Sequence, residues 1–271
     1  MVFLWFAAVV PCSVLGEGME RGAGSGEQEE TASLVGEGTV RREIVRTIFS
    51  GSEIMHFSVS WTGGIKIGDL SLDLESAGGD DFTIHTRVTD YGLFRLVYPV
   101  DDEFTTYVRG GSKLPYRYEV HQREGRRETR RLTLYDQAGL RVKYRKNEME
   151  EEVFPVAGTV HNEFSSFYIT RVMELVPGES FMVPTFADRK RNEVPVLVKG
   201  KEDIDTVFGR VRTVVVLPRM KFKGLYDKTG DTVIWLTDDE CRVPVRINSK
   251  ILIGSLTAEL TSYANPGCER Y

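Results

Sequence analysis

The sequence predicts a mainly β protein: a strongly curved antiparallel sheet, forming an open barrel or half-barrel, with one helix packed against it. Apolar and polar residues alternate along most of the chain after residue 40, which is typical of strands with one buried face. Glycine accounts for 26 of 271 residues, which favours many tight turns. Only one segment carries apolar residues at helical spacing. We expect about ten to twelve strands in a single domain at 41–263.

The first predicted hairpin lies at 57–74. Phe57 and Trp61 share the apolar face of its first strand, and Gly63-Gly64 turns the chain. In the second strand the apolar positions change parity after Gly68. We therefore expect a β-bulge at Gly68 that bends the strand, since a one-residue shift would otherwise expose its leucines.

A similar pattern recurs near the C-terminus. Residues 251–260 are identical to 65–74 at five of ten positions. We expect a turn at 248–250 and a second bulge at Gly254, so that two bent hairpins bracket the domain. A shared geometry explains the likeness better than a duplication. The remaining strands are expected at 82–88, 116–120, 132–134, 140–144, 211–217 and 232–237.

The one clear helix is predicted at 160–175, with about four turns. Asn162 can cap its start, and Pro177-Gly178 ends it. Because its apolar residues form a single stripe, the helix needs a sheet to lie on.

The N-terminus resembles a secretory signal. Val2 to Val10 is an apolar run, too short to span the ~30 Å of membrane hydrocarbon as a helix, and cleavage after Gly16 would follow a small-residue pattern. No Lys or Arg precedes the run, and Cys12 leaves open a lipoprotein anchor as the less favoured alternative. We expect a cleaved signal at 1–16, a flexible tether at 17–40, a tail at 264–271 and no membrane span in the mature chain. The expected location is the periplasm, with membrane association left open.

Removal of the signal leaves Cys241 and Cys268 as the only thiols. An even number of cysteines in an oxidising compartment makes them a disulfide candidate. The bond would close a loop of about 27 residues and add ~3 kcal/mol to stability. Two unpaired thiols are the alternative.

Common catalytic patterns are not found. The four histidines are widely spaced, and the sequence contains no HExxH, CxxC, GxSxG or P-loop. We predict no catalytic residues, no metal and no cofactor, hence no enzyme. The 35 basic residues against 40 acidic ones, a net charge of −5, also disfavour a nucleic-acid partner.

Two kinds of charged segment have a functional and a simpler interpretation. The acidic runs 101–103 and 238–240 could supply acid/base groups or Ca²⁺ ligands. Because adjacent residues of an extended chain point to opposite sides, we favour solvated turns. The basic segment Lys113 to Lys146 could attract anionic lipid headgroups. We favour the outer face of a hairpin, since glutamates dilute its charge.

Three blocks of the sequence resemble an envelope family, domain of unknown function 3108. They are 51–68, then Ser165 to Gly178 with Tyr168 and Arg171, and then 234–260 with its Trp-Leu-Thr-Asp-Asp run. The resemblance covers about 51–263. It implies an exported antiparallel β protein, similar in outline to the half-barrels of bacterial lipoprotein carriers, which shelter acyl chains in an apolar cavity. It implies no catalytic residue.

The apolar segment 91–98 either fills one end of the barrel or lines a cavity together with other aromatic residues. The candidate cavity residues are Trp61, Tyr91, Phe94, Tyr98, Phe164, Tyr168 and Trp235. The predicted function is a non-catalytic extracytoplasmic protein that binds an apolar or lipid-like ligand. The alternative is a structural or interaction protein of the cell envelope, with a filled core and an envelope protein as its partner.

Overall fold

The computed structural model describes residues 38–92, 95–96, 98–187, 189–219, 232–251 and 254–271. The expected signal and most of the expected tether lie outside these ranges. The described helices and strands are α1 (Arg42–Ile48), β1 (Ser52–Trp61), β2 (Ile65–Gly78), β3 (Asp81–Asp90), β4 (Val100–Arg109), β5 (Leu114–Glu124), β6 (Arg127–Asp136), β7 (Arg141–Lys146), β8 (Glu152–Pro155), α3 (Glu163–Val172), β9 (Ser180–Ala187), β10 (Lys190–Thr206), β11 (Gly209–Pro218), β12 (Thr232–Thr237), β13 (Pro244–Lys250) and β14 (Ser255–Ala264).

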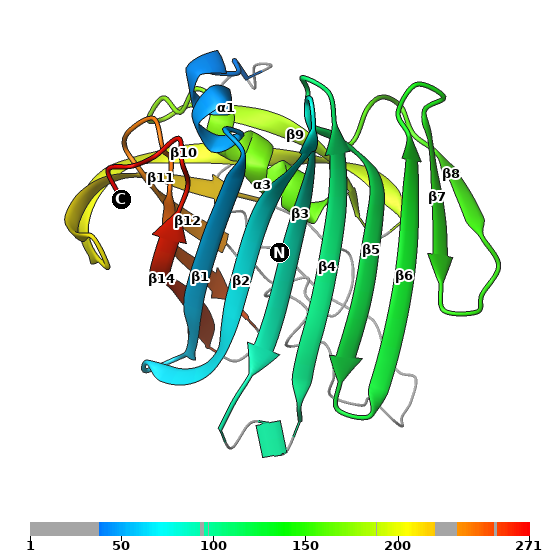
Figure 1. Ribbon diagram of the computed structural model, residues 1–271, viewed down its shortest axis with the longest axis horizontal. Helices are drawn as coiled ribbons and strands as arrows, with labels where there is room; N and C mark the ends of the chain where they lie inside the picture. The colour runs from blue at the N-terminus through cyan, green and yellow to red at the C-terminus, as the bar shows by residue number, and fades with distance from the viewer. Residues whose placement is uncertain (1–37, 93–94, 97, 188, 220–231, 252–253) are drawn as a thin grey trace, which may run out of the picture.

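The described strands form one antiparallel sheet in the order β8-β7-β6-β5-β4-β3-β2-β1-β14-β13-β12-β11-β10-β9. The first described strand, β1, lies at the centre of the sheet, and β2 to β8 build one half outward from it. The other half runs from the edge strand β9 back to β14, which pairs with β1. The sheet curls around α3 and is not closed (Figure 1). This confirms the predicted fold class, with fourteen described strands instead of ten to twelve.

Side chains link the two edge strands across the opening. Arg189 and Glu152 form an ion pair of 3.2 Å, and the rings of Phe154 and Phe186 lie 5.8 Å apart. The parallel bridge between His161 and Thr185 covers part of β9. Both edges thus carry contacts that blunt their tendency to recruit another strand.

The alternation read from the sequence corresponds to a concave, buried face and a convex, solvated face. In β4, for example, every second residue from Val100 to Val108 is buried. The core lies on the concave face, where Phe57, Leu74 and Ile84 of the front strands meet Leu236 and Val245 from the other half of the sheet. One continuous core therefore joins both halves of the sheet.

The expected bulge at Gly68 is confirmed. The β1–β2 register shifts between Val59, which pairs with Gly68, and Ser60, which pairs with Lys66. A Cβ at Gly68 would collide with the carbonyl oxygen of Thr89, so the close approach of β2 and β3 requires glycine there.

The second expected bulge is wrong. Strand β13 continues through 248–250, where the turn was predicted, and Gly254 belongs to the turn itself. Gly254 has φ of +87°, and its carbonyl accepts a hydrogen bond from the N–H of Ile251 at 3.1 Å. The apolar parity changes there because the chain reverses direction, and not because a strand absorbs an extra residue.

Helix α3 begins three residues later than predicted and has ten residues. His161 is engaged by β9, since its N–H donates to the carbonyl of Pro184 and its carbonyl accepts from Phe186, each at 2.8 Å. Helix α1 was not predicted. It is short and is held by two buried residues, Ile44 and Ile48. In the described ranges, no helix combines the length and hydropathy needed to cross a bilayer.

Candidate functional site

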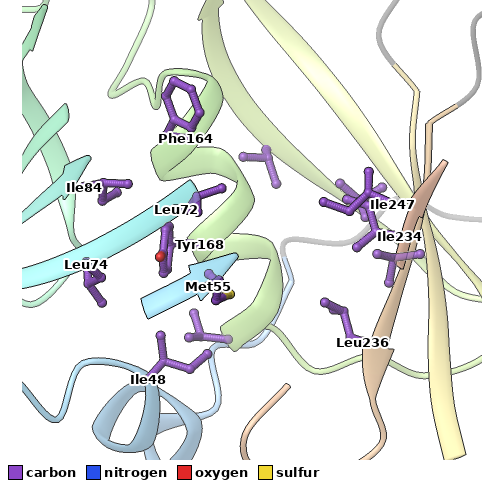
Figure 2. Close-up of a cluster of buried hydrophobic side chains, with 14 of the residues drawn as sticks. Ile48, Met55, Leu72, Leu74, Ile84, Phe164, Tyr168, Ile234, Leu236 and Ile247 are labelled. Atoms are coloured by element: carbon purple, nitrogen blue, oxygen red, sulfur yellow. The ribbon is translucent and has the colours of Figure 1, made fainter. Parts of the chain in front are cut away.

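An apolar cleft of about 70 Å³ lies between α3 and the concave face of the sheet. Leu70 and Leu72 of β2 form one wall with Phe164 and Phe167 of α3. Figure 2 shows Ile234 and Ile247 facing the helix from the opposite half of the sheet. The other lining residues are Glu163, Ser166, Thr170, Val183, Val194, Val196, Pro218 and Thr232.

Helix α3 is fixed over the cleft by its N-terminal cap. The side chain of Asn162 accepts from the Ser165 N–H, and the Ser165 hydroxyl accepts from the Asn162 N–H, both at 2.9 Å. Asn162 also donates to the hydroxyl of Thr106 in β4 at 2.7 Å. The ring of Phe164 then lies 5.4 Å from the ring of Phe104. The cap predicted from sequence is confirmed, and it sets the position of the cleft's aromatic wall.

A buried ion pair fixes the other end of α3. Arg171 and Glu53 of β1 have fully buried side chains and form two hydrogen bonds of 2.6 and 2.7 Å. Arg171 also donates to the carbonyl of Arg242, and Tyr263 donates to Glu53, both at 3.0 Å. Burial by itself would lower the pKa of Arg171, but Glu53 raises it above its usual value. Arg171 therefore stays charged, and its bonds join the helix to both halves of the sheet.

Cys241 and Cys268 form a disulfide with a Cα–Cα distance of 5.8 Å. Cys268 is buried and packs on the core. The hydroxyl of the last residue, Tyr271, donates to Asp239, and its ring lies 4.4 Å from that of Phe208. Residues 264–271, expected as a tail, are thus fastened to the body of the protein.

A second group of polar side chains, three of them buried and one half-buried, lies on the concave face, at the end of β4, β5 and β6 away from the cap. It consists of Asp102, Gln122, Glu124 and Arg131, and we call it the rim cluster. Gln122 donates to Asp102 and accepts from Arg131, each at 2.9 Å. The Arg123 N–H adds a 3.0 Å bond to Asp102. Asp102 and Gln122 are therefore fully tied into the sheet.

Glu124 differs from its neighbours. Its side chain is 8% exposed and makes no hydrogen bond or ion pair with the described residues. Burial, followed by the charge of Asp102, raises its pKa to about 7, against the lowering effect of Arg131 and Arg127. Burial also raises the pKa of Asp102. The rim cluster can accordingly gain or lose a proton close to neutral pH.

Of the six predicted cavity residues that the structure describes, Phe164 alone lines the apolar cleft. Tyr168 is buried elsewhere, with its ring 5.9 Å from that of Phe49. Trp235 is on the convex face, where it donates to Glu202 and lies under the guanidinium of Arg246. The prediction for Trp235 was wrong because its neighbours in β12 occupy the inward positions.

Trp61, Tyr91 and Tyr98 lie toward one end of the sheet, at the end of β1, after β3 and before β4. Trp61 and Tyr91 are half-buried, and Trp61 packs against the edge of the core. Tyr98 packs beside Gly125, next to Glu124 in the rim cluster. Phe94 lies outside the described residues. The predicted cavity residues are all aromatic, whereas most of the cleft is lined by aliphatic residues at the inward positions of strands.

The acidic run 101–103 is split between the two faces of β4. Asp101 pairs with Arg87 on the convex face at 3.0 Å, while Asp102 points inward. In the second run, Asp239 accepts from the N–H of Cys241 at 2.9 Å and organises a turn. Within the described ranges, no three His, Cys, Asp or Glu side chains are grouped so that they could hold a metal ion.

The basic segment forms the convex face of β5 to β7, which contains an open groove of about 770 Å³. Arginines and glutamates line this groove together. Nearby basic groups have acidic partners, as in Arg130 with Glu128 at 2.8 Å and Lys143 with Glu151 at 3.1 Å. These pairs favour the interpretation of a solvated outer face.

Comparisons with known proteins identify a family and one solved structure of similar fold. A family model described as "Protein of unknown function (DUF3108)" matches residues 56–261. The chain is similar to the β-barrel-like protein of domain of unknown function 1849 from Brucella abortus, with a TM-score of 0.54 and 8% identity over 79% of this chain and 98% of that one. A hypothetical protein from Chlamydia trachomatis matches with a TM-score of 0.39 and 4% identity, over 82% and 92% of the two chains. No curated protein matches. The Brucella likeness supports the fold alone.

Proposed function

The chain belongs to the DUF3108 family, and we propose that it is a non-catalytic extracytoplasmic protein that holds an apolar, lipid-like chain between α3 and the concave face of its sheet. The apolar cleft is the observation that carries the proposal. Ten of its fourteen lining residues are aliphatic or aromatic, and they come from both halves of the sheet and from the helix. Such a site attracts ligands through burial of apolar surface, at roughly 25 cal/mol per Å².

The size of the cleft limits the ligand. About 70 Å³ is far below the roughly 300–1,000 Å³ of pockets that enclose drug-sized molecules. The space suits a short run of methylene groups from one alkyl chain. We therefore propose a single-chain ligand, or one chain of a larger lipid whose remainder stays outside the cleft.

The disulfide supports the proposed compartment. Stable disulfides are typical of secreted and periplasmic proteins and are rare in a reducing cytosol. The Cys241–Cys268 bond, together with the apolar run at the start of the sequence, favours export. Cell fractionation and N-terminal sequencing of the native protein test this part. Recovery in the cytosol with residues 1–16 intact would contradict it.

One observation favours the alternative of a structural envelope protein. The remainder of the concave face is filled by a continuous core, and the cleft occupies a small part of it. If the cleft only reflects imperfect packing, no ligand should accompany the protein. Function would then lie on the outer surface.

Native mass spectrometry of gently purified protein, combined with decanol titration by calorimetry, distinguishes a ligand-binding protein from a structural envelope protein. Val196→Phe should fill the cleft, because Val196 lines it. Val233→Phe is the matched control, since Val233 lies in the same half of the sheet but at an outward position of β12. We expect decanol binding to survive in the control and to fall at least tenfold in Val196→Phe. Equal binding by both variants would refute the cleft as the site.

A further inference from the structure

We propose that the rim cluster binds the positively charged head of the ligand, so that the preferred ligand is an alkylammonium amphiphile whose tail occupies the apolar cleft. The inference rests on the proposed function for the tail and adds a second site for the head. It rests on the position of the rim cluster, on the charge of the cluster, and on the acceptors without a partner in and beside it.

A single row of paired residues connects the two sites. Leu70, which lines the cleft, pairs with Val88, and Val88 pairs with Asp102, which in turn pairs with Gln122. Neighbouring strands are about 4.8 Å apart, so Asp102 lies about 10 Å from Leu70 along the concave face. Val88, between them, is buried and apolar. The part of the concave face that separates the two sites is therefore apolar.

The rim cluster contains acceptors without partners. The carboxylate of Glu124 makes no hydrogen bond with the described residues, and the residue as a whole is 8% exposed. The hydroxyl of Tyr98, beside Glu124, and one carboxylate oxygen of Asp90, at the end of β3, are also buried without a partner. Buried polar groups are rarely left unsatisfied without a functional reason. An ammonium group brings three N–H donors, which suits a set of acceptors of this kind.

The charges favour a cationic head. Asp90, Asp102 and Glu124 place three carboxyl groups on this part of the concave face, opposed by the guanidinium groups of Arg131 and Arg127. Arg127 is exposed and is therefore screened by solvent. A carboxylate head would add a further negative charge beside buried carboxyl groups and would be disfavoured, whereas a hydroxyl head would leave the excess charge unchanged.

A cationic head also makes binding depend on pH. The groups that face Glu124 are Asp102, Arg131, Arg127 and Tyr98. Because the pKa of Glu124 is about 7, its ionised fraction rises from about a tenth at pH 6 to about nine-tenths at pH 8. Alkylammonium affinity should therefore rise up to about tenfold over this range, while the affinity for an alcohol of the same length should stay constant.

The test is calorimetric titration at pH 6 and pH 8 with decylammonium, decanol and decanoate, each below its critical micelle concentration. The variant Glu124→Gln keeps the shape of the side chain and removes its charge. Glu119→Gln is the matched control, because Glu119 lies on the same strand but on the convex face, paired with Arg117. Circular dichroism confirms that both variants are folded, and Asp102→Asn provides a second variant in the rim cluster.

We expect wild type to bind decylammonium at least tenfold more tightly than decanol at pH 8. Glu124→Gln should lose that preference and keep its decanol affinity, and Glu119→Gln should behave as wild type. Equal affinity for all three probes would overturn the rim cluster as a head site while leaving the cleft intact. An equal loss in Glu119→Gln would assign the preference to surface charge and overturn it as well. Failure of every probe to bind would overturn both this inference and the proposed function.

Discussion

Replacing Glu53 by Gln tests how the helix is held to the sheet. The substitution keeps the size of the side chain and removes the only carboxylate that contacts Arg171 in the described structure. Arg171 would remain fully buried, with two bonds of 2.6 and 2.7 Å to a charged acceptor replaced by weaker bonds to a neutral amide. Removal of one partner from a buried ion pair costs about 3–5 kcal/mol, because the other charge is left uncompensated.

The contacts that remain in Glu53→Gln put its expected loss of stability toward the lower part of the range of about 3–5 kcal/mol. Arg171 keeps its 3.0 Å bond to the carbonyl of Arg242, and the Gln oxygen can still accept from Tyr263. We therefore expect Glu53→Gln to lower the free energy of unfolding by about 3 kcal/mol. The double variant Glu53→Gln with Arg171→Met should recover part of this loss, since it removes the unpaired charge.

Urea denaturation at pH 7, with the disulfide intact, measures the free energy of unfolding of the single and the double variant. Circular dichroism follows the sheet, and a common slope among the variants supports two-state behaviour. The double-mutant cycle isolates the coupling between the two side chains, expected to exceed 2 kcal/mol. A single-variant loss below about 1 kcal/mol, or a coupling near zero, would refute the view that this pair fixes α3.

Three further predictions concern stability. Glu124→Gln should raise the free energy of unfolding by about 2–3 kcal/mol at pH 8 but not at pH 4. The reason is that the raised pKa of Glu124 makes wild type lose stability as the pH rises from about 4.5 to 7. The same difference in unfolding free energy between variant and wild type at both pH values would contradict this prediction. Joint replacement of Cys241 and Cys268 by Ser should cost about 3 kcal/mol in urea titration, and a change under 1 kcal/mol would mean that the bond adds nothing. Asn162→Ala should cost about 1–2 kcal/mol because it removes the cap and the bond to Thr106, and thermal melting that matches wild type would argue against it.

The parts of the fold that local patterns specify could be predicted from the sequence. Alternation identified the strands, and the two glycines at 63–64 set a turn, with φ values of +82° and +81°. Asn162 and Ser165 are three positions apart, so the cap could be predicted without tertiary information. In each case, the residues that determine the structure are neighbours in the chain.

Features that depend on distant residues could not be predicted. Glu53 and Arg171 are 118 positions apart, and the rim cluster combines side chains from β4, β5 and β6. At Gly254 the same parity change that marks a bulge at Gly68 marks a turn instead, because apolar pattern alone does not distinguish a bent strand from a reversal. Trp235 was wrongly predicted to line a cavity because it was chosen for its aromatic side chain. Its position in the strand, between two inward-facing residues, places it on the outer face.

Methyl NMR of the protein titrated with decanol tests the central claim most directly, that the concave face holds an apolar chain beside α3. The account predicts saturable shifts at the methyl groups of Leu70, Leu72, Ile234 and Ile247, which line the cleft, and none at Leu132 or Val153 away from it. Shifts confined to outer-face methyl groups, or no saturable shift at any methyl group, would contradict it.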